Sequence, residues 1–549
     1  MGSDGVNLGM VSEKGHLDAS ELDEGAVLEA DVLIIGSGAG GGICAEALAE
    51  RNIRVVVVEE GPFKKTADFT MREKEAFQDL YFECGGRRTK DKAIGIFQGR
   101  AVGGSTTVNW TASFRTPEQT LRYWSNEFGL SGFSAEDLAP WFDRVEKRLN
   151  ISPWLPAPNE NNAIIARGAA ALDWSYGTVP RNVRGCADLG LCGQGCPIGA
   201  KQSMLVTTIP RAMELGATVI SRARAARLLL RQGRVEGAVL EPLDSLGRPK
   251  RTIQLEVRAP LVIVAAGGIG SPALLLRSAT PDPDRLIGSR TFLHPTVVVT
   301  GAMPQQVAGY RGAPQTVYSD HFLWRDGIEG RMGFKIEALA IQPSLFSGLM
   351  MRHGAEHQSF MQRINDTQGS IMLLRDGFNE ESPGGRVGLD AFDYPELDYT
   401  VNDYLWEGVR EAYLRASEML FAAGANNIQL WHFDAPSLTS WTQAKQFIAN
   451  LQLKPLSTGL FSAHVMGGCS MGADPRRSVV DSRGAHHHVK NLYVIDGSLF
   501  PTSLGTNPQL TIYAIAAKLA NELAERHWPA PSSFQKRESA MNPISGASL

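Results

Sequence analysis

The amino-acid sequence predicts an α/β protein with a Rossmann-like dinucleotide domain and a discontinuous α+β domain built on an antiparallel sheet. Three observations predict this fold class. Apolar strands near the N-terminus are joined to helices through glycine loops, which is typical of parallel strands buried on both faces. The stretch from Pro295 to about Leu453 instead has spaced strand-like runs and helical patches. After it a buried strand and a helix return, so the chain leaves the first domain and comes back.

Composition narrows the functional class. The 549 residues carry 54 basic and 58 acidic side chains, a net charge of −4, which argues against nucleic acid as the main partner. Six cysteines are too few for a disulfide scaffold and fit a reducing compartment. We find neither a secretory signal nor about 18 uninterrupted apolar residues, so we expect a cytoplasmic protein without a transmembrane segment. Glycine is in surplus, at 57 residues where about 38 are usual.

The elements of the first domain follow in a regular order. Strand, glycine loop, helix and strand occupy residues 31–35, 36–41, 43–50 and 54–58, a third strand and its helix occupy 261–265 and 273–276, and the returning pair occupies 492–495 and 510–526. In the middle domain, strand-like runs cover 296–300, 334–340, 370–374 and 386–389, and a helix is expected over 405–423. Alternating strands and helices predict the parallel sheet of the first domain.

The glycine loop predicts a dinucleotide site. Gly36 permits the tight turn, Gly38 lets the backbone approach a pyrophosphate, and Gly41 lets the helix pack on the strand. Glu59 closes the second strand, where an acidic residue holds ribose hydroxyls and disfavours the 2′-phosphate of NADP. This pattern alone does not separate NAD from FAD.

Further segments resemble the glucose–methanol–choline (GMC) family of FAD-dependent oxidoreductases. They are a flavin-lining signature, a second signature, a strand of the substrate domain and a C-terminal catalytic block: residues 99–110, 267–278, 386–390, and 464–472 with 491–498 and 505–508. Together they follow the family's order from about residue 30 to 526. The resemblance implies a Rossmann-like FAD-binding domain and an α+β substrate-binding domain.

The resemblance implies bound FAD and a set of contacts to it. Some members carry a histidine that tethers the flavin covalently where this chain has Val108, which has no nucleophilic atom, so we expect non-covalent FAD. The implied cofactor-binding residues are Gly36, Ser37, Gly38, Ala39, Gly41, Glu59, Gly103, Gly104, Ser105, Asn109, Ala225, Asp496, Gly497 and Pro508.

Domain boundaries follow from the same motifs. We expect a flexible arm over 1–28, the FAD-binding domain over 29–294, the substrate-binding domain over 295–456, the return of the FAD-binding domain over 457–528 and a tail over 529–549.

Within the family the chain is most similar to the long-chain alcohol oxidase type. Residues 108–117 and 121–124 carry that likeness, and variants in the catalytic block resemble cholesterol oxidase as well. The plant long-chain oxidases carry membrane segments, and this sequence shows none. The resemblance implies oxidation of an apolar alcohol (long-chain, aromatic or steroid-like) to an aldehyde or ketone.

Two residues of the catalytic block are the candidates for catalysis. Alcohol oxidation by a flavin removes the hydroxyl proton while a hydride leaves the carbon for flavin N5. We expect His464 to be the base, since an imidazole titrates near neutral pH. Asn507 matches the family position that holds the substrate oxygen, but it also precedes Pro508 and a helix, which is the pattern of an N-cap. His294 resembles a structural motif of the family at the domain boundary.

Apolar residues of the middle domain have two interpretations. They either line a substrate pocket or form the core of that domain; they are Phe346, Met350, Met351, Phe360, Met361 and Met372.

Three cysteines are concentrated in eleven residues. The spacing of Cys186, Cys192 and Cys196 resembles that of GMC dehydrogenase subunits in which three thiolates hold a [3Fe-4S] cluster. The alternative is that they are inherited loop cysteines, free or in a disulfide. A cluster would favour a dehydrogenase that passes electrons to a partner protein or quinone.

Two other classes stay open at this point. GMC relatives include lyases and a photodecarboxylase, so a non-oxidative reaction is an alternative. A flavin-binding protein without turnover would have a degenerate catalytic block, whereas this one is intact.

Overall fold

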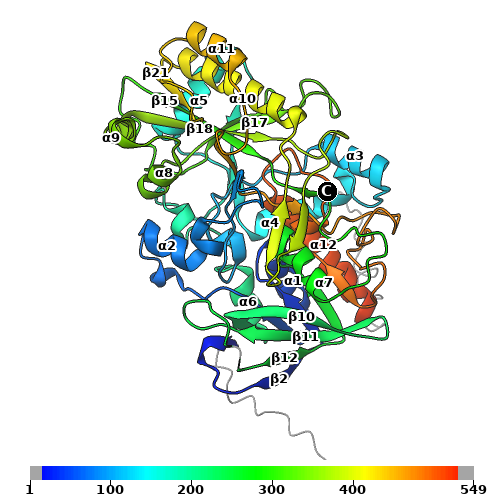
Figure 1. Ribbon diagram of the computed structural model, residues 1–549. Coiled ribbons are helices and arrows are strands. Elements are labelled where there is room, and N and C mark those ends of the chain that lie inside the picture. The colour runs from blue at the N-terminus through cyan, green and yellow to red at the C-terminus, as the bar shows by residue number, and fades with distance from the viewer. Residues whose placement is uncertain (1–14, 251, 530–549) are drawn as a thin grey trace, which may run out of the picture.

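The computed structural model describes residues 15–250 and 252–529. One end of the molecule carries the sheet of β2 and β10–β12, and the other carries α5, α10 and α11 over a second large sheet (Figure 1). None of the helices within these ranges is long and apolar enough to cross a membrane.

A six-stranded parallel sheet forms the centre of the first domain. Its strand order is β1 (His16–Asp18), β9 (Thr218–Ser221), β4 (Val55–Val58), β3 (Val32–Ile35), β13 (Leu261–Val264) and β24 (Leu492–Val494). Every neighbouring pair is parallel. All residues of β3, β4 and β13 are buried, as their unbroken apolar runs predict. With α1 (Ala39–Ala49) between β3 and β4, the predicted Rossmann-like fold is confirmed.

The predicted flexible arm over 1–28 is wrong where the structure describes it. β1 extends the parallel sheet, and β2 (Ala26–Glu29) joins a second sheet with β12 (Leu255–Arg258), β11 (Arg234–Pro242) and β10 (Ala223–Arg231). His16 bonds to the Ser221 hydroxyl at 2.9 Å, and Asp18 forms an ion pair with Arg222. Residues 1–14 lie outside the described ranges, as does the predicted tail beyond residue 529.

The second domain is built on an eight-stranded, mostly antiparallel sheet. Its strands are β5 (Ile94–Ile96), β22 (Leu460–Ser462), β15 (Thr296–Ala302), β18 (Thr367–Leu374), β17 (Phe334–Ala338), β16 (Val317–Ser319) and β7 (Gly177–Thr178), with β21 (Asn427–Leu430) paired to β15. The helices α5 (Glu160–Ala171), α10 (Asp403–Ala422) and α11 (Trp441–Asn450) pack against this part. Because β5, β7 and β22 come from outside residues 295–456, the two domains are more interleaved than the predicted boundaries state.

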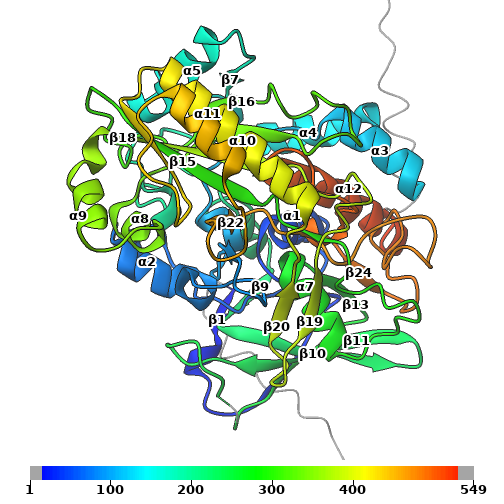
Figure 2. The ribbon, with the colours of Figure 1, turned by 45° about the horizontal axis from the view of Figure 1, so that its top comes forward.

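One predicted strand of the substrate domain lies elsewhere. Residues 386–389 form β19 (Arg386–Leu389), which pairs only with β20 (Pro395–Asp398) as a two-stranded ribbon. The ribbon packs on α7 (Gly267–Arg277) of the first domain, as Figure 2 shows. The sequence motif predicts a strand correctly but not its neighbours.

The remaining elements surround these sheets. They are α2 (Glu73–Leu80), α3 (Glu118–Phe128), α4 (Ala135–Arg148), α6 (Thr208–Glu214), α8 (Pro343–Leu349), α9 (Gly354–Gln362), α12 (Gln509–His527), and the pairs β6 (Ile151–Pro153) with β8 (Pro180–Asn182) and β14 (Thr291–Phe292) with β23 (Met466–Gly467).

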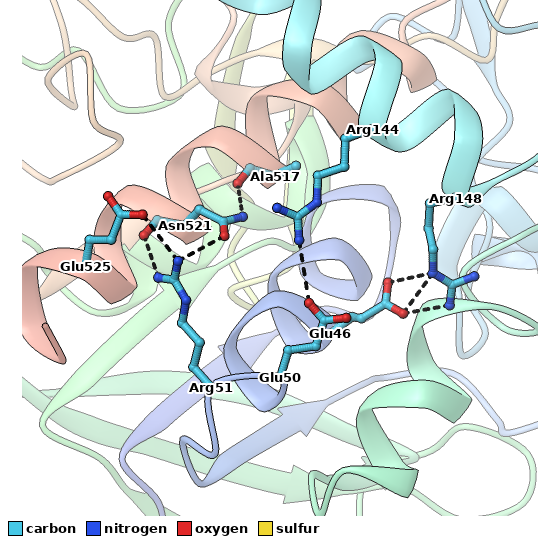
Figure 3. Close-up of polar contacts among 8 residues, drawn as sticks. All are labelled: Glu46, Glu50, Arg51, Arg144, Arg148, Ala517, Asn521 and Glu525. Atoms are coloured by element: carbon cyan, nitrogen blue, oxygen red, sulfur yellow. Dashed lines mark hydrogen bonds and ion pairs between the residues drawn. The ribbon is translucent and has the colours of Figure 1, made fainter. Parts of the chain in front are cut away.

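Charged groups hold the returning helix α12 and the helix α4 onto α1 (Figure 3). Glu46 of α1 accepts hydrogen bonds from the Arg148 guanidinium at 2.6–3.1 Å and is 7% exposed. Arg51 binds the Asn521 carbonyl at 2.9 Å and its side-chain amide at 3.2 Å. These contacts fix the C-terminal segment against the dinucleotide helix.

We expect Glu46→Gln to reduce the free energy of unfolding by about 1–2 kcal/mol, because it removes a half-buried charge-assisted pair. Glu50→Gln is the matched control: its pair with Arg144 is exposed, at 3.5 Å, so a change below about 0.5 kcal/mol is expected. Urea unfolding of both variants measures the difference. Equal losses would show that the Glu46 pair contributes nothing beyond a surface contact.

Candidate active site

A cavity of about 590 Å³ lies between the two domains and is lined by both. Most of the site residues predicted from the sequence lie on its wall: Gly36, Gly38, Ala39, Glu59, Gly104, Ser105, Asn109, Ala225, His464, Asp496, Gly497, Asn507 and Pro508. Ser37, Gly41 and Gly103 do not line the cavity; they lie behind the residues that do. The cavity therefore brings the glycine loop, the flavin-lining segment and the catalytic block together.

The glycine loop forms a backbone cradle at the start of α1. Gly36 has φ +103°, and a Cβ there would lie 2.3 Å from the Ala265 oxygen. A Cβ at Gly41 would lie 1.9 Å from the Gly36 oxygen, so helix and strand pack closely, as predicted. A Cβ at Gly38 would instead meet only Gly104 Cα, at an ordinary contact distance of 3.8 Å. Side-chain-free backbone at a helix N-terminus fits the pyrophosphate of FAD.

Ser37 and Glu59 connect this cradle to the neighbouring loops. The Ser37 hydroxyl donates to Glu59 Oε2 at 2.6 Å and accepts from the Gly103 N–H at 3.0 Å. Glu59 Oε1 accepts from the Gly61 N–H at 2.9 Å. Burial raises the pKa of Glu59, and these hydrogen bonds oppose the rise. Ser37 thus positions the carboxylate that is expected to hold the ribose.

Asp496 joins the catalytic block to the start of α7. Its carboxylate accepts from the Gly267 N–H at 2.7 Å, the Ser271 hydroxyl at 2.6 Å and the Ser498 N–H at 2.7 Å. Burial raises its pKa, while these hydrogen bonds favour the charged form. A carboxylate with this many donors is a fixed part of the cavity wall.

Two buried cations that no sequence motif indicates hold the flavin-lining segment. Lys201 Nζ donates to the carbonyls of Thr107 at 2.6 Å and Asn109 at 3.0 Å, and burial lowers its pKa to about 8. Arg181, fully buried, donates to the Thr111 hydroxyl at 2.7 Å. Both residues lie near the cysteine segment, where no local pattern marks them.

His464 lies on the cavity wall and bonds to His294. The two Nδ1 atoms are 3.2 Å apart, and the Gly505 N–H donates to His294 Nε2 at 3.1 Å. Burial lowers the pKa of His464 to about 3, helped by the charge of Lys335, and burial also lowers the pKa of His294 well below its usual range. Both imidazoles are therefore neutral at neutral pH, and each carries one hydrogen.

These hydrogen bonds select a tautomer for each ring. His294 Nε2 accepts from Gly505, so the hydrogen of His294 lies on Nδ1 and donates to His464 Nδ1. The hydrogen of His464 then lies on Nε2, the nitrogen left for the cavity. In the resting state His464 is a hydrogen-bond donor, whereas the base role predicted from the sequence requires the other tautomer. That role stays a prediction.

Asn507 is held by an ion pair rather than used as a helix cap. Its Oδ1 accepts from Lys335 Nζ at 3.2 Å and its Nδ2 donates to Glu337 Oε2 at 3.2 Å. The helix α12 begins at Gln509, and its N-cap residue is Pro508 without a side-chain cap, so the N-cap interpretation is wrong. The carboxamide lies on the cavity wall in a fixed orientation, as a substrate-oxygen contact requires.

Lys335 and Glu337 form a buried ion pair behind Asn507. Their nitrogen and oxygen are 3.2 Å apart, and the side chains are 3% and 0% exposed. Burial lowers the pKa of Lys335 to about 8, and Glu337 opposes that shift. The two residues stand two apart on β17 and so share a face. Opposite charges at this spacing inside an apolar strand are the sequence signal that identifies such a pair.

The part of the cavity on the side of the second domain is mostly apolar, and Thr296 and Gln315 are uncharged polar residues that this domain adds to the wall. It is lined by Val298, Leu339, Leu345, Phe346, Leu349, Ile371, Leu373, Trp431 and Phe461. Six apolar residues of the middle domain are predicted either to line a substrate pocket or to form the domain core, and of these only Phe346 lines the cavity. Met350, Met351, Phe360 and Met361 pack behind it, and Met372 belongs to the other core cluster of the domain. The core interpretation is therefore correct for five of them.

The predicted iron–sulfur ligand set is not formed. Within residues 15–250 and 252–529, no three His, Cys, Asp or Glu side chains are arranged to hold a metal ion, and Cys186, Cys192 and Cys196 are all free thiols. Arg181 Nη2 donates to Cys192 Sγ at 3.7 Å, so a guanidinium lies beside this thiol. These residues give the cluster hypothesis no support, and it stays a prediction.

Comparison with known proteins identifies the family. Two family profiles described as GMC oxidoreductase match residues 77–296 and 382–516, and one described as FAD binding domain matches residues 31–69. The chain belongs to the GMC oxidoreductases, which are flavoprotein enzymes that act on CH–OH donors. This confirms the resemblance and FAD as the cofactor of the family.

Individual relatives cover most of the chain. A long-chain-alcohol oxidase of Arabidopsis thaliana is 29% identical over 93% of this chain and 71% of its own length. An uncharacterised GMC-type oxidoreductase of Mycobacterium tuberculosis is 31% identical over 91% of this chain and 76% of its own. The crystal structure of pyridoxine 4-oxidase from Mesorbium loti has the same fold, with a TM-score of 0.64, 19% identity and coverage of 91% and 100%.

The ribbon of β19 and β20 covers the end of the cavity near Glu59. Tyr394 and Pro395 line the cavity there, beside Ala225. The Arg224 guanidinium lies 5.0 Å from the centre of the Tyr394 ring. Because this end receives the adenosine half of FAD if the pyrophosphate lies at Gly38, the ribbon is positioned to cover it.

We expect Tyr394→Ala to weaken FAD binding about tenfold, since it removes an aromatic ring and its cation–π partner from this wall. The rise of FAD fluorescence on release from the diluted holoenzyme measures the loss. Phe392→Ala is the control, because Phe392 is 81% exposed at the ribbon tip and does not line the cavity. Equal FAD release from both variants would contradict a role for Tyr394 in holding the cofactor.

Proposed function

We propose that this protein oxidises an apolar primary or secondary alcohol (long-chain, aromatic or steroid-like) to the aldehyde or ketone, with FAD as oxidant. The observation that carries the proposal is the position of His464 and Asn507 on a wall that continues into an apolar chamber. A chamber lined by aliphatic and aromatic side chains favours a substrate whose non-reacting part is apolar. The similarity to long-chain-alcohol oxidases supports the same substrate class.

The reaction removes a hydride from the alcohol carbon and a proton from its oxygen. When bound, FAD supplies the oxidised ring system that accepts the hydride. His464 Nε2 and the Asn507 amide are the polar groups on the wall that meet the hydroxyl. As the C–O bond gains double-bond character, negative charge on the oxygen is stabilised by N–H donors held in place beforehand.

The hydroxyl proton needs an acceptor, and the structure offers two. His464 Nε2 accepts it only after its own hydrogen has moved to Nδ1, which opposes the bonds of His294 and Gly505. Glu337 is the carboxylate bonded to Asn507; it is 0% exposed and does not line the cavity, so the proton reaches it only through a water molecule that connects it to the hydroxyl. The first route is the sequence-based prediction, and the second keeps His464 as a donor.

The direct test is anaerobic addition of alcohols to the purified holoenzyme. We expect straight-chain and aromatic alcohols to bleach the visible flavin band, and sugars and other polyhydroxy alcohols to leave it unchanged, because the chamber offers them few polar partners. A flavin that no alcohol bleaches would refute the proposed function. Re-oxidation by air then separates an oxidase from a dehydrogenase that uses a partner protein or quinone.

Two substitutions of His464 separate a base from a donor. His464→Ala should slow anaerobic flavin reduction by a factor of about 10³ or more while FAD stays bound. His464→Gln keeps an N–H donor but cannot take up a proton. If His464 donates, the Gln variant should retain at least about ten times the rate of the Ala variant. Equal rates of flavin reduction in the two variants would instead support His464 as the base.

A further inference from the structure

Four aromatic side chains of the cavity wall form one continuous row, and three of them belong to the apolar chamber. The ring centroids of Phe97 and Phe461 are 6.4 Å apart, those of Phe461 and Trp431 are 5.6 Å apart, and those of Trp431 and Phe346 are 5.0 Å apart. Phe461 and His464 both line the cavity and are three residues apart in the chain. The row continues beyond the chamber to Phe360, 5.5 Å from Phe346, which does not line the cavity. Phe346 is therefore the last ring of this row that lines the cavity.

Phe346 is held firmly in this position. It is 2% exposed, stacked on Phe360 at an interplanar angle of 22° and set edge-on to Trp431 at 68°. A ring packed between two others keeps one orientation, because protein interiors leave little free volume for movement. The end of the chamber is thus a defined surface.

The helix that carries Phe346 is clamped at both sides. The two carboxylate oxygens of Glu73, at the start of α2, accept the N–H groups of Ser344 and Leu345 at 2.9 Å each. This satisfies free donors at the N-terminus of α8. On the other side, the Ser347 hydroxyl bonds to His357 of α9 at 3.1 Å. Both ribbon views show α8 beside α2 and α9 (Figures 1 and 2).

The strands between the two ends of the row offer an apolar path. Val298 of β15 and Ile371 and Leu373 of β18 face the chamber, and no charged side chain belongs to this part of the wall. An alkyl or fused-ring tail would lose water along the whole row and gain affinity with each buried methylene.

We propose that Phe346 determines specificity by setting the length of the apolar tail that the enzyme accepts. The hydroxyl is held at His464, the tail runs along the aromatic row, and the Phe346 ring stops it. The proposal rests on the proposed function, because it takes an apolar alcohol as the substrate.

The test compares straight-chain primary alcohols of increasing length in wild type, Phe346→Ala and Phe346→Trp. We expect the Ala variant to prefer longer alcohols: kcat/KM for a chain two methylenes beyond the wild-type optimum should rise about tenfold relative to that optimum, as expected from burying them. The Trp variant should shift the optimum to shorter chains. Because the two variants should shift the preferred chain length in opposite directions, the test still works if one of them fails to fold.

Phe360→Ala is the matched control, since it removes a ring of the same size that stacks on Phe346 but lies outside the chamber. Because it loosens the stack on Phe346 but leaves the ring on the chamber wall in place, it should shift the order of alcohols less than Phe346→Ala does. An unchanged order in both Phe346 variants would overturn the proposal, and so would a shift in Phe360→Ala as large as that in Phe346→Ala.

A binding series separates this proposal from the proposed function. Straight-chain alkyl methyl ethers have no hydroxyl proton and are not oxidised in this way, so their affinity, read from perturbation of the flavin spectrum, reports the tail alone. Affinity should stop rising at a chain length that Phe346→Ala extends. Wild-type flavin that is not reduced by any alcohol but shows this length limit would refute the reaction and keep Phe346. Flavin reduction by alcohols without any limit on chain length would support the proposed reaction and refute the role of Phe346.

Discussion

Close contact between backbones is the constraint on which the cavity depends. A Cβ at Gly40 of the first helix would lie 2.0 Å from the carbonyl oxygen of Ile495, and one at Gly268 would lie 3.0 Å from the backbone of Val465, the neighbour of His464. Segments from distant parts of the sequence therefore meet with no side chain between them. The glycine surplus serves these contacts and the cradle at Gly38, because the catalytic block cannot approach the dinucleotide helix otherwise.

Buried ionisable groups give the site its electrostatic character. Burial of Lys335 and Glu337 costs solvation energy that their mutual attraction does not fully return, so stability alone does not explain the pair. The pair instead fixes both atoms of the Asn507 amide and keeps a positive charge near His464. That charge, together with burial, keeps both histidines neutral. Because a neutral imidazole carries one hydrogen, the hydrogen bond from the Gly505 N–H selects the tautomer of each ring.

The sequence predicted best what local patterns and motifs determine. Gly36, Gly38 and Glu59 follow a spacing that the strand–loop–helix unit imposes, and all three line the same cavity. The strands at residues 16–18 and 26–29 were missed because they are too short for a periodic signal, and only their partners on other strands stabilise them. Asn507 is the opposite case, because the N-cap pattern around it is misleading and contacts to β17 determine its orientation. The cytoplasmic location stays a prediction from composition.

Both histidines of the site lie where the chain crosses between the two domains. His294 lies between β14 and β15, and His464 lies between β22 and β23, so each crossing has one imidazole. Ser462 ties the two crossings together, since its hydroxyl donates to the Leu293 carbonyl and accepts the His464 N–H at 3.2 Å. The orientation of the domains therefore determines where Nε2 of His464 lies relative to the cofactor cradle. An imidazole held at this joint lies between the cofactor cradle of one domain and the apolar chamber of the other, which explains why neither domain alone contains the complete cavity.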